Sequence, residues 1–156
     1  MNNIWAPWRT EYVKAPKSND GCIFCDAPNL ADPLMIVSGS TCYAIMNRYP
    51  YAAGHCMVLP YRHAGDLTEL EVSERAELLD LAARLEEALR TALKPTGFNI
   101  GFNIGSDAGA GFAGHLHLHI VPRWPGDTNF MPVLADVHMI SEHIEATCAR
   151  IKAALK

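Results

Sequence analysis

Three histidines alternate with apolar residues between positions 114 and 124, where the chain reads GHLHLHIVPRW. Strict alternation over this length is typical of a half-buried β-strand, in which successive side chains point to opposite faces. The apolar side chains are therefore expected in the core, and the imidazoles are expected to line a surface. Pro122 has no N–H to donate to a neighbouring strand and is expected to end the strand. The imidazoles belong to His115, His117 and His119, and the apolar side chains to Leu116, Leu118 and Ile120.

Three imidazoles on one face allow three interpretations. They could form a polar strand face in which every histidine is hydrogen-bonded, or they could bind zinc or another borderline cation. They could also be a nucleophilic histidine with two partners, one of which fixes its tautomer while the other donates to a phosphate oxygen. A metal-dependent hydrolase is the weakest of these, because no carboxylate lies beside the histidines of the strand.

The segment before the histidines is rich in glycine. From position 98 the chain reads FNIGFNIGSDAGAGFAG, a short β-like run over residues 98–103 followed by a loop of mostly small residues. Such a loop lets backbone N–H groups turn toward an anion and lets a ligand approach closely. It is neither a Walker A loop nor the GxGxxG dinucleotide motif. The loop favours a nucleophilic histidine that acts beside a phosphate.

The composition indicates one ordinary globular domain over residues 1–156, with an N-terminal arm (residues 1–20) that docks through Trp5 and Trp8. Of its residues 49% are hydrophobic and the formal net charge is −4, which argues against nucleic-acid or membrane binding. No apolar run is long enough to cross a bilayer, and no signal peptide is evident. Five cysteines, an odd number, fit a reducing compartment. A cytoplasmic location is expected.

The apolar pattern predicts further elements. Two short strands are expected over residues 42–46 and 55–59, joined by a turn. Ser73 is expected to cap a long helix that Pro95 ends, with Thr68 and Glu71 as an alternative capping box. Its apolar stripe is core or dimer interface, and Ser141 is expected to cap a C-terminal helix. The stripes are Leu78, Ala82, Leu85, Leu89 and Leu93, and Ile144, Cys148, Ile151 and Leu155.

Residues 115–121 match the His-φ-His-φ-His-φ-φ signature, and the chain resembles the histidine-triad (HIT) superfamily of nucleotide hydrolases and transferases. It is most similar to the bacterial diadenosine tetraphosphate phosphorylases and hydrolases, over nearly its whole length. The resemblance implies an α+β fold with an antiparallel sheet of about five strands, one long central helix and a C-terminal helix, in a homodimer. Other matching stretches are WAPWR (5–9), CIFC (22–25), NRYPY (47–51), GH (54–55), PRW (122–124) and NF (129–130).

The same resemblance implies roles for the residues of the site. His117 would attack the α-phosphorus and form a nucleotidyl-histidine, while the carbonyl of His115 would fix its tautomer and His119 would donate to the phosphate. Asn47 would face the sugar. Arg123 and Trp124 could reach the distal end of the substrate, with the cation on phosphate and the ring on a base. The phosphate oxygens would be stabilised by Asn103 and by N–H groups of Gly109, Ala110 and Gly111.

The implied substrates are dinucleoside polyphosphates, adenine nucleotides among them, with water or inorganic phosphate as the second acceptor. Two alternatives stay open: hydrolysis of nucleoside phosphoramidates or other small nucleotide esters, and a zinc-stabilised nucleotide-binding module without turnover. The loop motivates the first of these. Close relatives often carry Ser or Thr shortly before the triad, where this chain has Gly111-Phe112-Ala113.

Cys22 and Cys25 are spaced as half of a zinc site or as a redox pair. No second cysteine pair exists, so histidines would have to complete a zinc site. The resemblance implies His63 and His115 as the other two ligands, which would give a structural Cys₂His₂ site. The alternative is two buried thiols that behave as small hydrophobic residues.

Overall fold

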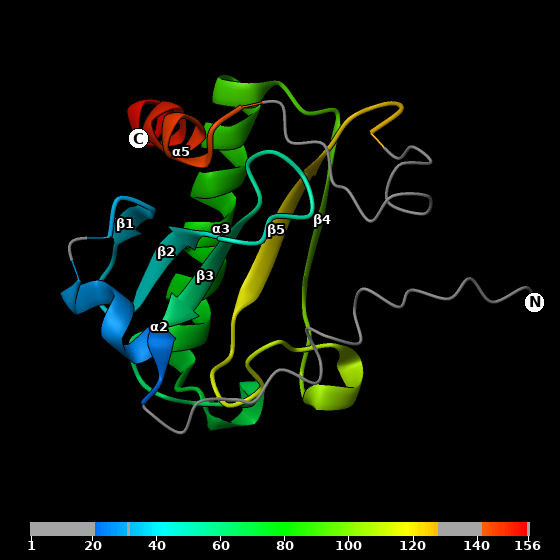
Figure 1. Ribbon diagram of the computed structural model, residues 1–156. Coiled ribbons are helices and arrows are strands. Elements are labelled where there is room, and N and C mark those ends of the chain that lie inside the picture. Colours follow the sequence, from blue (N-terminus) through cyan, green and yellow to red (C-terminus); the bar gives the residue numbers. More distant parts are fainter. Residues whose placement is uncertain (1–20, 31, 128–141, 156) are drawn as a thin grey trace, which may run out of the picture.

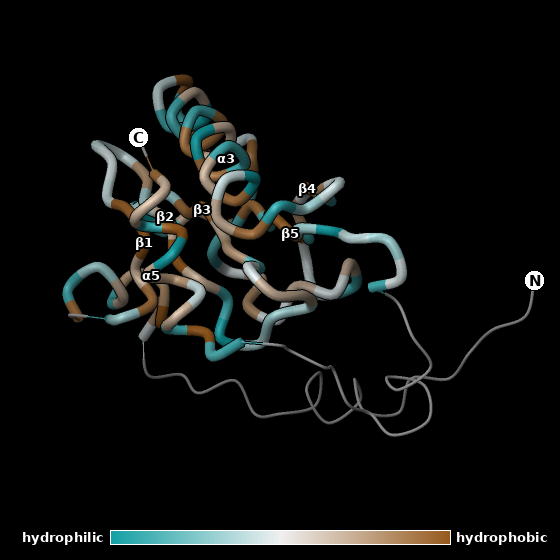
Figure 2. The backbone as a smooth tube through the Cα atoms, turned by 90° about the horizontal axis from the view of Figure 1, so that it is seen from above, coloured by the Kyte–Doolittle hydropathy of each residue, from teal (hydrophilic) through white to brown (hydrophobic). Residues whose placement is uncertain are grey.

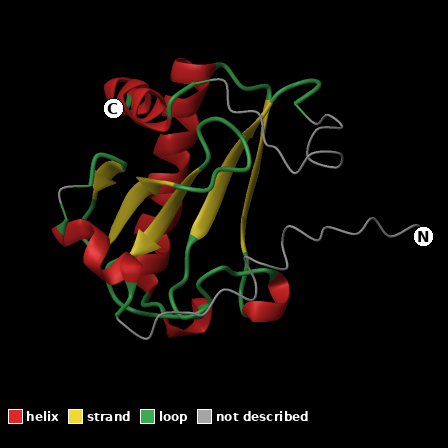
Figure 3. Ribbon diagram, in the orientation of Figure 1, coloured by secondary structure: helices red, strands yellow, loops and turns green. Residues whose placement is uncertain are grey.

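The computed structural model describes residues 21–30, 32–127 and 142–155, so the predicted N-terminal arm lies outside the described residues. Within them, five strands form one antiparallel sheet in the order β1-β2-β3-β5-β4 (Figures 1 and 3). The strands are β1 (Met35–Ser38), β2 (Cys42–Met46), β3 (Cys56–Pro60), β4 (Gly97–Phe102) and β5 (Leu118–Arg123). The helices are α2 (Ile23–Asp26), α3 (Val72–Leu93) and α5 (Ile144–Ala154), with short 3₁₀ segments at Ala27–Asn29, Leu67–Glu69 and Ser106–Ala108. The predicted α+β fold is confirmed.

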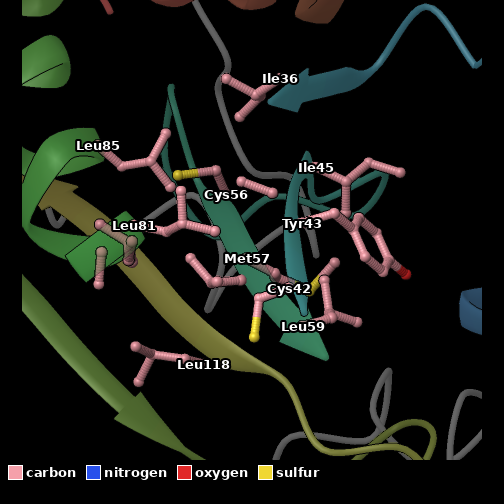
Figure 4. Close-up of a cluster of buried hydrophobic side chains, with 14 of the residues drawn as sticks. Ile36, Cys42, Tyr43, Ile45, Cys56, Met57, Leu59, Leu81, Leu85 and Leu118 are labelled. Carbon is pink, nitrogen blue, oxygen red and sulfur yellow. The ribbon is translucent and has the colours of Figure 1, made fainter. Parts of the chain in front are cut away.

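Helix α3 crosses one face of the sheet, and α5 packs against α3 and β1 (Figure 2). The core lies between α3 and the sheet, where Leu81 and Leu85 face Cys56 of β3 (Figure 4). The predicted stripe of α3 is core and not an interface, because Leu78 and Leu89 are also buried. The opposite face of the sheet is left to carry the histidines.

The predicted cap of α3 is wrong, because Glu71 rather than Ser73 precedes the first turn. Glu71 and Glu74 form a reciprocal capping box, in which the backbone N–H of Glu71 donates to Glu74 Oε2 over 2.7 Å. Arg62 also donates to the Glu74 carboxylate, so a tertiary contact holds the box. Thr68 does not pair with Glu71; its N–H and hydroxyl both donate to Asp66 Oδ1.

The histidine strand differs from the prediction at both ends. Strand β5 begins only at Leu118, after His115 and His117, and continues through Pro122 to Arg123. The backbone carbonyl of Arg123 accepts a hydrogen bond from the N–H of Thr96, on the β4 side of the strand. Because the backbone groups of successive strand residues point to opposite sides, the backbone nitrogen of Pro122 points toward the β3 side. Pairing between β3 and β5 covers only residues 118–120, so Pro122 has no strand to donate to there. The proline therefore fits inside the strand.

Strand β1 and helix α2 are too short for hydrophobic periodicity to predict, at four residues each. Helix α5 buries Cys148 and Ile151 as expected from the apolar spacing. Its predicted cap, Ser141, lies outside the described residues. No helix in the described part of the chain combines the length and the apolar composition that a membrane crossing requires.

Candidate active site

The three histidines are buried, which differs from the expected surface position. His115, His117 and His119 are 0%, 6% and 8% exposed. Phe24 of α2 covers two of them, with its ring centroid 5.7 Å from that of His115 and 5.3 Å from that of His117. The ring of Tyr51 lies 6.0 Å from that of His119. Strand alternation predicts that the histidines share a face. It could not predict that Phe24 of α2 and Tyr51 of the β2–β3 turn cover that face.

His117 is held in one tautomer by the backbone. Its Nδ1 lies 2.8 Å from the carbonyl oxygen of His115. Because a carbonyl only accepts, Nδ1 carries the proton and Nε2 keeps its lone pair. Burial lowers the pKa of His117 below 6.5, and the hydrogen bond to His115 offsets only part of that effect. The imidazole is therefore neutral at pH 7 and can approach a phosphate as a nucleophile.

A fourth histidine, His55, completes the cluster and was not identified from the sequence as a site residue. It is 0% exposed, and its Nδ1 accepts from the backbone N–H of Tyr51 over 3.0 Å. Its proton must therefore lie on Nε2, which is 3.0 Å from Nδ1 of His119. His119 accepts there, so its own proton lies on Nε2. A histidine just before β3 was visible in the sequence, but its pairing with a residue 64 positions away was not.

His119 Nε2 is the only buried side-chain nitrogen or oxygen among the described residues that has no hydrogen-bond partner. Burial lowers the pKa of His119 to about 4, with a smaller contribution from His117, and burial together with His119 and His117 lowers that of His55 to about 3. Both rings are thus neutral at pH 7. A buried N–H donor without an acceptor is costly unless a ligand supplies one. An anionic phosphate oxygen would be such an acceptor.

Asn47 follows β2 and lies beside His55. Its Oδ1 accepts from the backbone N–H of Tyr49 over 2.9 Å, and its Nδ2 lies 3.4 Å from His55 Nε2. The hydrogen bond to Tyr49 fixes the orientation of the amide. Asn47 therefore presents its NH₂ group at the histidine cluster.

The glycine loop folds partly on itself. Gly105 and Gly109 adopt positive φ angles of 82° and 87°, around a 3₁₀ turn between them. The N–H of Gly109 donates to Ser106 O over 3.0 Å, and that of Ala110 donates to Gly105 O over 3.4 Å. Two of the three amides predicted to face a phosphate are thus engaged within the loop, which leaves Gly111 as the remaining predicted donor.

Asn103 and Arg123 lie with His119 along one cleft. Arg123 donates to both oxygens of Asp127 over 2.6 and 2.8 Å and to Asn99 Oδ1 over 2.8 Å. Trp124 contributes a backbone N–H to Asp127, and it does not line the cleft. The charge that was expected to meet a distal phosphate is therefore already paired. The residues expected beyond it, at 129 and 130, lie outside the described part of the chain.

Cys22, Cys25, His63 and His115 form one cluster, with one donor atom from each within 4.8 Å of the others. Nδ1 of His115 is 3.3 Å from Cys22 Sγ and 3.5 Å from Cys25 Sγ, and Nδ1 of His63 is 3.4 Å from Cys25 Sγ. Metal bonds of tetrahedral zinc imply a sulfur-to-nitrogen edge of roughly 3.5 Å. The donor set and its spacing fit a metal ion.

His115 is also oriented for metal binding. Its Nε2 lies 2.9 Å from the carbonyl oxygen of Pro60, so Nε2 carries the proton and Nδ1 turns its lone pair toward the cysteines. The ring of His115 thus belongs to the cysteine–histidine cluster, whereas its backbone carbonyl accepts from His117. The two sites share this residue and the cover of Phe24.

An antiparallel five-stranded sheet that places a buried histidine row beside a glycine loop defines a histidine-triad domain. The HIT domain model matches residues 31–126, and the chain belongs to this family. The chain is 36% identical over 157 residues to an AP-4-A phosphorylase of Mycobacterium tuberculosis, an alignment that covers 94% of this chain and 80% of that protein. It is also similar to a bis(5'-nucleosyl)-tetraphosphatase (asymmetrical) of Schizosaccharomyces pombe, at 32% identity over 54% of this chain and 46% of the other.

A similar solved structure is that of a Zn-bound histidine triad family protein from Mycobacterium smegmatis. It superposes with a TM-score of 0.71 at 28% identity, over 86% of this chain and 92% of the other. The relatives from Mycobacterium tuberculosis and Schizosaccharomyces pombe are both named as enzymes that act on dinucleoside tetraphosphates.

Proposed function

We propose that this protein cleaves dinucleoside polyphosphates through a nucleotidyl-histidine on His117. The observation that carries the proposal is the tautomer of His117, whose Nδ1–H is held by His115 O at 2.8 Å so that Nε2 is free to attack. In the first step Nε2 would bond to the α-phosphorus while the bond from phosphorus to the departing nucleotide breaks. The Nε2–H of His119 would donate to a phosphate oxygen at this step.

In the second step, water or inorganic phosphate would attack the phosphorus and break its bond to His117, releasing AMP or ADP. Asn47 would hold the sugar of the transferred nucleotide. The phosphate would receive hydrogen bonds from Asn103 and from the backbone N–H of Gly111, because the N–H groups of Gly109 and Ala110 donate within the loop. The AP-4-A phosphorylase to which the chain is similar supports an adenine dinucleotide as substrate and leaves phosphorolysis and hydrolysis to be separated by experiment.

The test is incubation with diadenosine tetraphosphate, with and without inorganic phosphate, followed by product identification. Phosphate-dependent ADP plus ATP identifies a phosphorylase, and AMP plus ATP regardless of phosphate identifies a hydrolase. His117→Ala should abolish turnover, whereas His143→Ala, a change at a side chain that is 78% exposed, should leave it unchanged. Absence of turnover by the unaltered protein would overturn the proposal.

One feature favours a second candidate, the hydrolysis of nucleoside phosphoramidates or other small esters. By the family resemblance, close relatives often carry Ser or Thr in the stretch that corresponds to Gly111-Phe112-Ala113. Here the ring of Phe112 packs edge-on against that of Phe24, with the ring centroids 5.6 Å apart. This makes the loop beside the triad apolar. Turnover of adenosine phosphoramidate without turnover of the tetraphosphate would select this candidate, and turnover of neither would select a binding module.

We also propose that zinc occupies the cluster of Cys22, Cys25, His63 and His115. The ion would act structurally, because four protein ligands close a tetrahedral site and leave no position for substrate. By binding the ion, Cys22 and Cys25 would anchor α2. This helix carries Phe24, whose ring covers His117.

The family resemblance further supports a homodimer of single-domain chains, each spanning residues 1–156, in the cytoplasm. β4 is the last strand in the sheet order of the described residues, which offers an edge for a second copy. Light scattering after size exclusion should give the mass of two chains. All five cysteines are free thiols, in keeping with a reducing compartment.

A further inference from the structure

A cleft of about 280 Å³ begins at His119 and is lined by residues of β4 and β5 and by Tyr51. His119 forms part of its wall, whereas His117 does not. We infer that this cleft binds the nucleoside of the departing nucleotide, an inference that rests on the proposed function. The ligand class is a nucleoside polyphosphate whose base stacks on Tyr51 and whose sugar meets Asn99.

The position of the cleft follows from the direction of β5. Along a strand, alternate side chains share a face and rise by roughly 6.6 Å every two residues. His117, His119, Val121 and Arg123 therefore follow one another along one face, and the cleft covers the last three. The attacking and leaving groups lie roughly in line on opposite sides of the phosphorus. A phosphate attacked by His117 beside His119 would thus release its leaving group toward the cleft.

Tyr51 offers a ring that is already positioned. Its backbone N–H donates to His55 over 3.0 Å, and its ring lies 4.6 Å from the ring of His55. The residue is nonetheless 51% exposed. One face of the ring is thus supported by the histidine cluster, and enough of the side chain is accessible for a base to stack on it.

The charge of the cleft suits a nucleoside better than a chain of phosphates. Arg123 is paired with Asp127 through two hydrogen bonds, so the pair is close to neutral. Asn99 accepts from Arg123 through Oδ1, which leaves its amide NH₂ as a donor. A neutral amide of this kind matches ribose hydroxyls and base edges.

The space in the cleft is created by Gly101. This residue lies opposite His119 in the β4–β5 register, and a Cβ added to it would meet no atom within 4 Å. Pockets that enclose a whole drug-sized ligand measure roughly 300–1,000 Å³. At about 280 Å³ the cleft has room for one nucleoside and not for a whole dinucleotide. The other nucleoside would lie on the Asn47 side.

The experiment compares binding of AMP with binding of a methylene-bridged, non-hydrolysable diadenosine tetraphosphate, measured by calorimetry on the full chain. Tyr51→Leu removes the ring, and Gly101→Val fills the cleft with a residue that strands favour. Tyr51→Leu should weaken binding of the dinucleotide analogue by roughly 5- to 150-fold, the range of one base–aromatic stack, and leave AMP binding unchanged. Gly101→Val should likewise weaken binding of the dinucleotide analogue and not that of AMP. The matched controls are Tyr49→Leu in the same turn and Gly97→Val on the same strand, where an added Cβ also meets nothing within 4 Å.

The inference would be overturned if Tyr51→Leu weakened binding of AMP and of the dinucleotide analogue equally, or weakened binding of neither. Far-ultraviolet circular dichroism checks that each variant folds. If Gly101→Val does not fold, the result for Tyr51→Leu decides alone. Failure of the proposed function is a separate outcome. In that case the unaltered protein would not turn over diadenosine tetraphosphate, while the selective loss of dinucleotide binding would still be measured.

Discussion

At the scale of single residues, the site depends on the fixed tautomers of three histidines, His55, His117 and His119. The backbone N–H of Tyr51 places the proton of His55 on Nε2, and this N–H in turn places the proton of His119 on its own Nε2. Independently, the carbonyl of His115 places the proton of His117 on Nδ1. A peptide N–H can only donate and a carbonyl can only accept, so each backbone group imposes one tautomer on the ring beside it. The result is one unprotonated nitrogen on His117 and one N–H donor on His119, on rings whose centroids are 4.7 Å apart.

His55→Leu should lower kcat for the tetraphosphate, because His119 Nδ1 loses its donor and the ring can turn or change tautomer. Loss of a buried hydrogen bond costs about 1–3 kcal/mol, which corresponds to roughly 5- to 150-fold in rate. His55→Gln retains an amide N–H and should recover part of the rate. Steady-state kinetics of both variants give the comparison, and equal rates for Leu and Gln would contradict a donor role for His55.

At the scale of elements, α2 connects the cluster of Cys22, Cys25, His63 and His115 to His117. The helix has only four residues and buries none of them, so it has little packing of its own. The Tyr43 hydroxyl donates to Phe24 O over 2.6 Å, and Cys22 and Cys25 flank Phe24 in sequence. Ligation of the two cysteines would therefore hold Phe24 over His117.

Cys25→Ser should reduce bound zinc from one ion per chain to a small fraction of that, measured by elemental analysis after dialysis. Cys148→Ser is the matched control, because Cys148 is buried beneath carbonyls of residues 33–35, far in sequence from the cluster. It should keep the full zinc content. Zinc retained by Cys25→Ser, or absent from the unaltered protein, would contradict the proposed site.

Helix α3 is also tied to the β1–β2 turn through Glu77. Its carboxylate accepts from the N–H groups of Ser40 over 2.6 Å and of Cys42 over 3.0 Å, and from the N–H and hydroxyl of Thr41. Burial raises the pKa of Glu77, but these hydrogen bonds outweigh it and lower the pKa to about 2. Gly39 is required beside it, since an added Cβ would lie 2.5 Å from Glu77 Oε1.

Glu77→Gln should lower the free energy of unfolding by about 1–3 kcal/mol, because one carboxylate acceptor becomes a donor that faces other donors. Glu86→Gln on the same helix removes only an exposed pair with Arg90 and should cost about 0.3–0.5 kcal/mol. Urea unfolding at pH 7 measures both. Equal losses in the two variants would show that Glu77 does not hold the turn.

At the scale of the whole molecule, burying several histidines makes stability depend on pH. Folded pKa values of about 3 for His55 and about 4 for His119 lie below the ordinary value of 6.5. Between these values the unfolded chain binds protons that the folded protein does not. Stability is therefore fully present above pH 6.5 and falls as the pH decreases toward about 4.

Urea unfolding between pH 7 and pH 4 should show this decrease. His55→Leu removes one buried titrating group and should flatten the curve. The contribution of Glu77 lies in a lower window, from its ordinary pKa of 4.5 down to about 2. A stability curve that is level from pH 6.5 to pH 4 would contradict the assigned burial of the histidines.

The sequence by itself determined the features that depend on local period and spacing. Alternation with period 2 identified the shared face of His117 and His119, and helical spacing identified the buried stripe of α3. The cysteine pair marked one half of a cluster that could hold a metal ion. The family motif, which is also local, identified the α+β fold. These patterns suffice because strand and helix geometry alone decide which neighbours in sequence share a face.

Only the tertiary structure decided which distant residues meet. The sheet order places β3 beside β5, which brings His55 to His119 across 64 residues and makes the histidines buried and neutral. Arg62 reaching Glu74 likewise moved the cap of α3 to Glu71, against local preference. Such contacts depend on strand order and on the elements that cover a face. No local period encodes either, so the tautomers of the site and the cleft beyond it followed only from the fold.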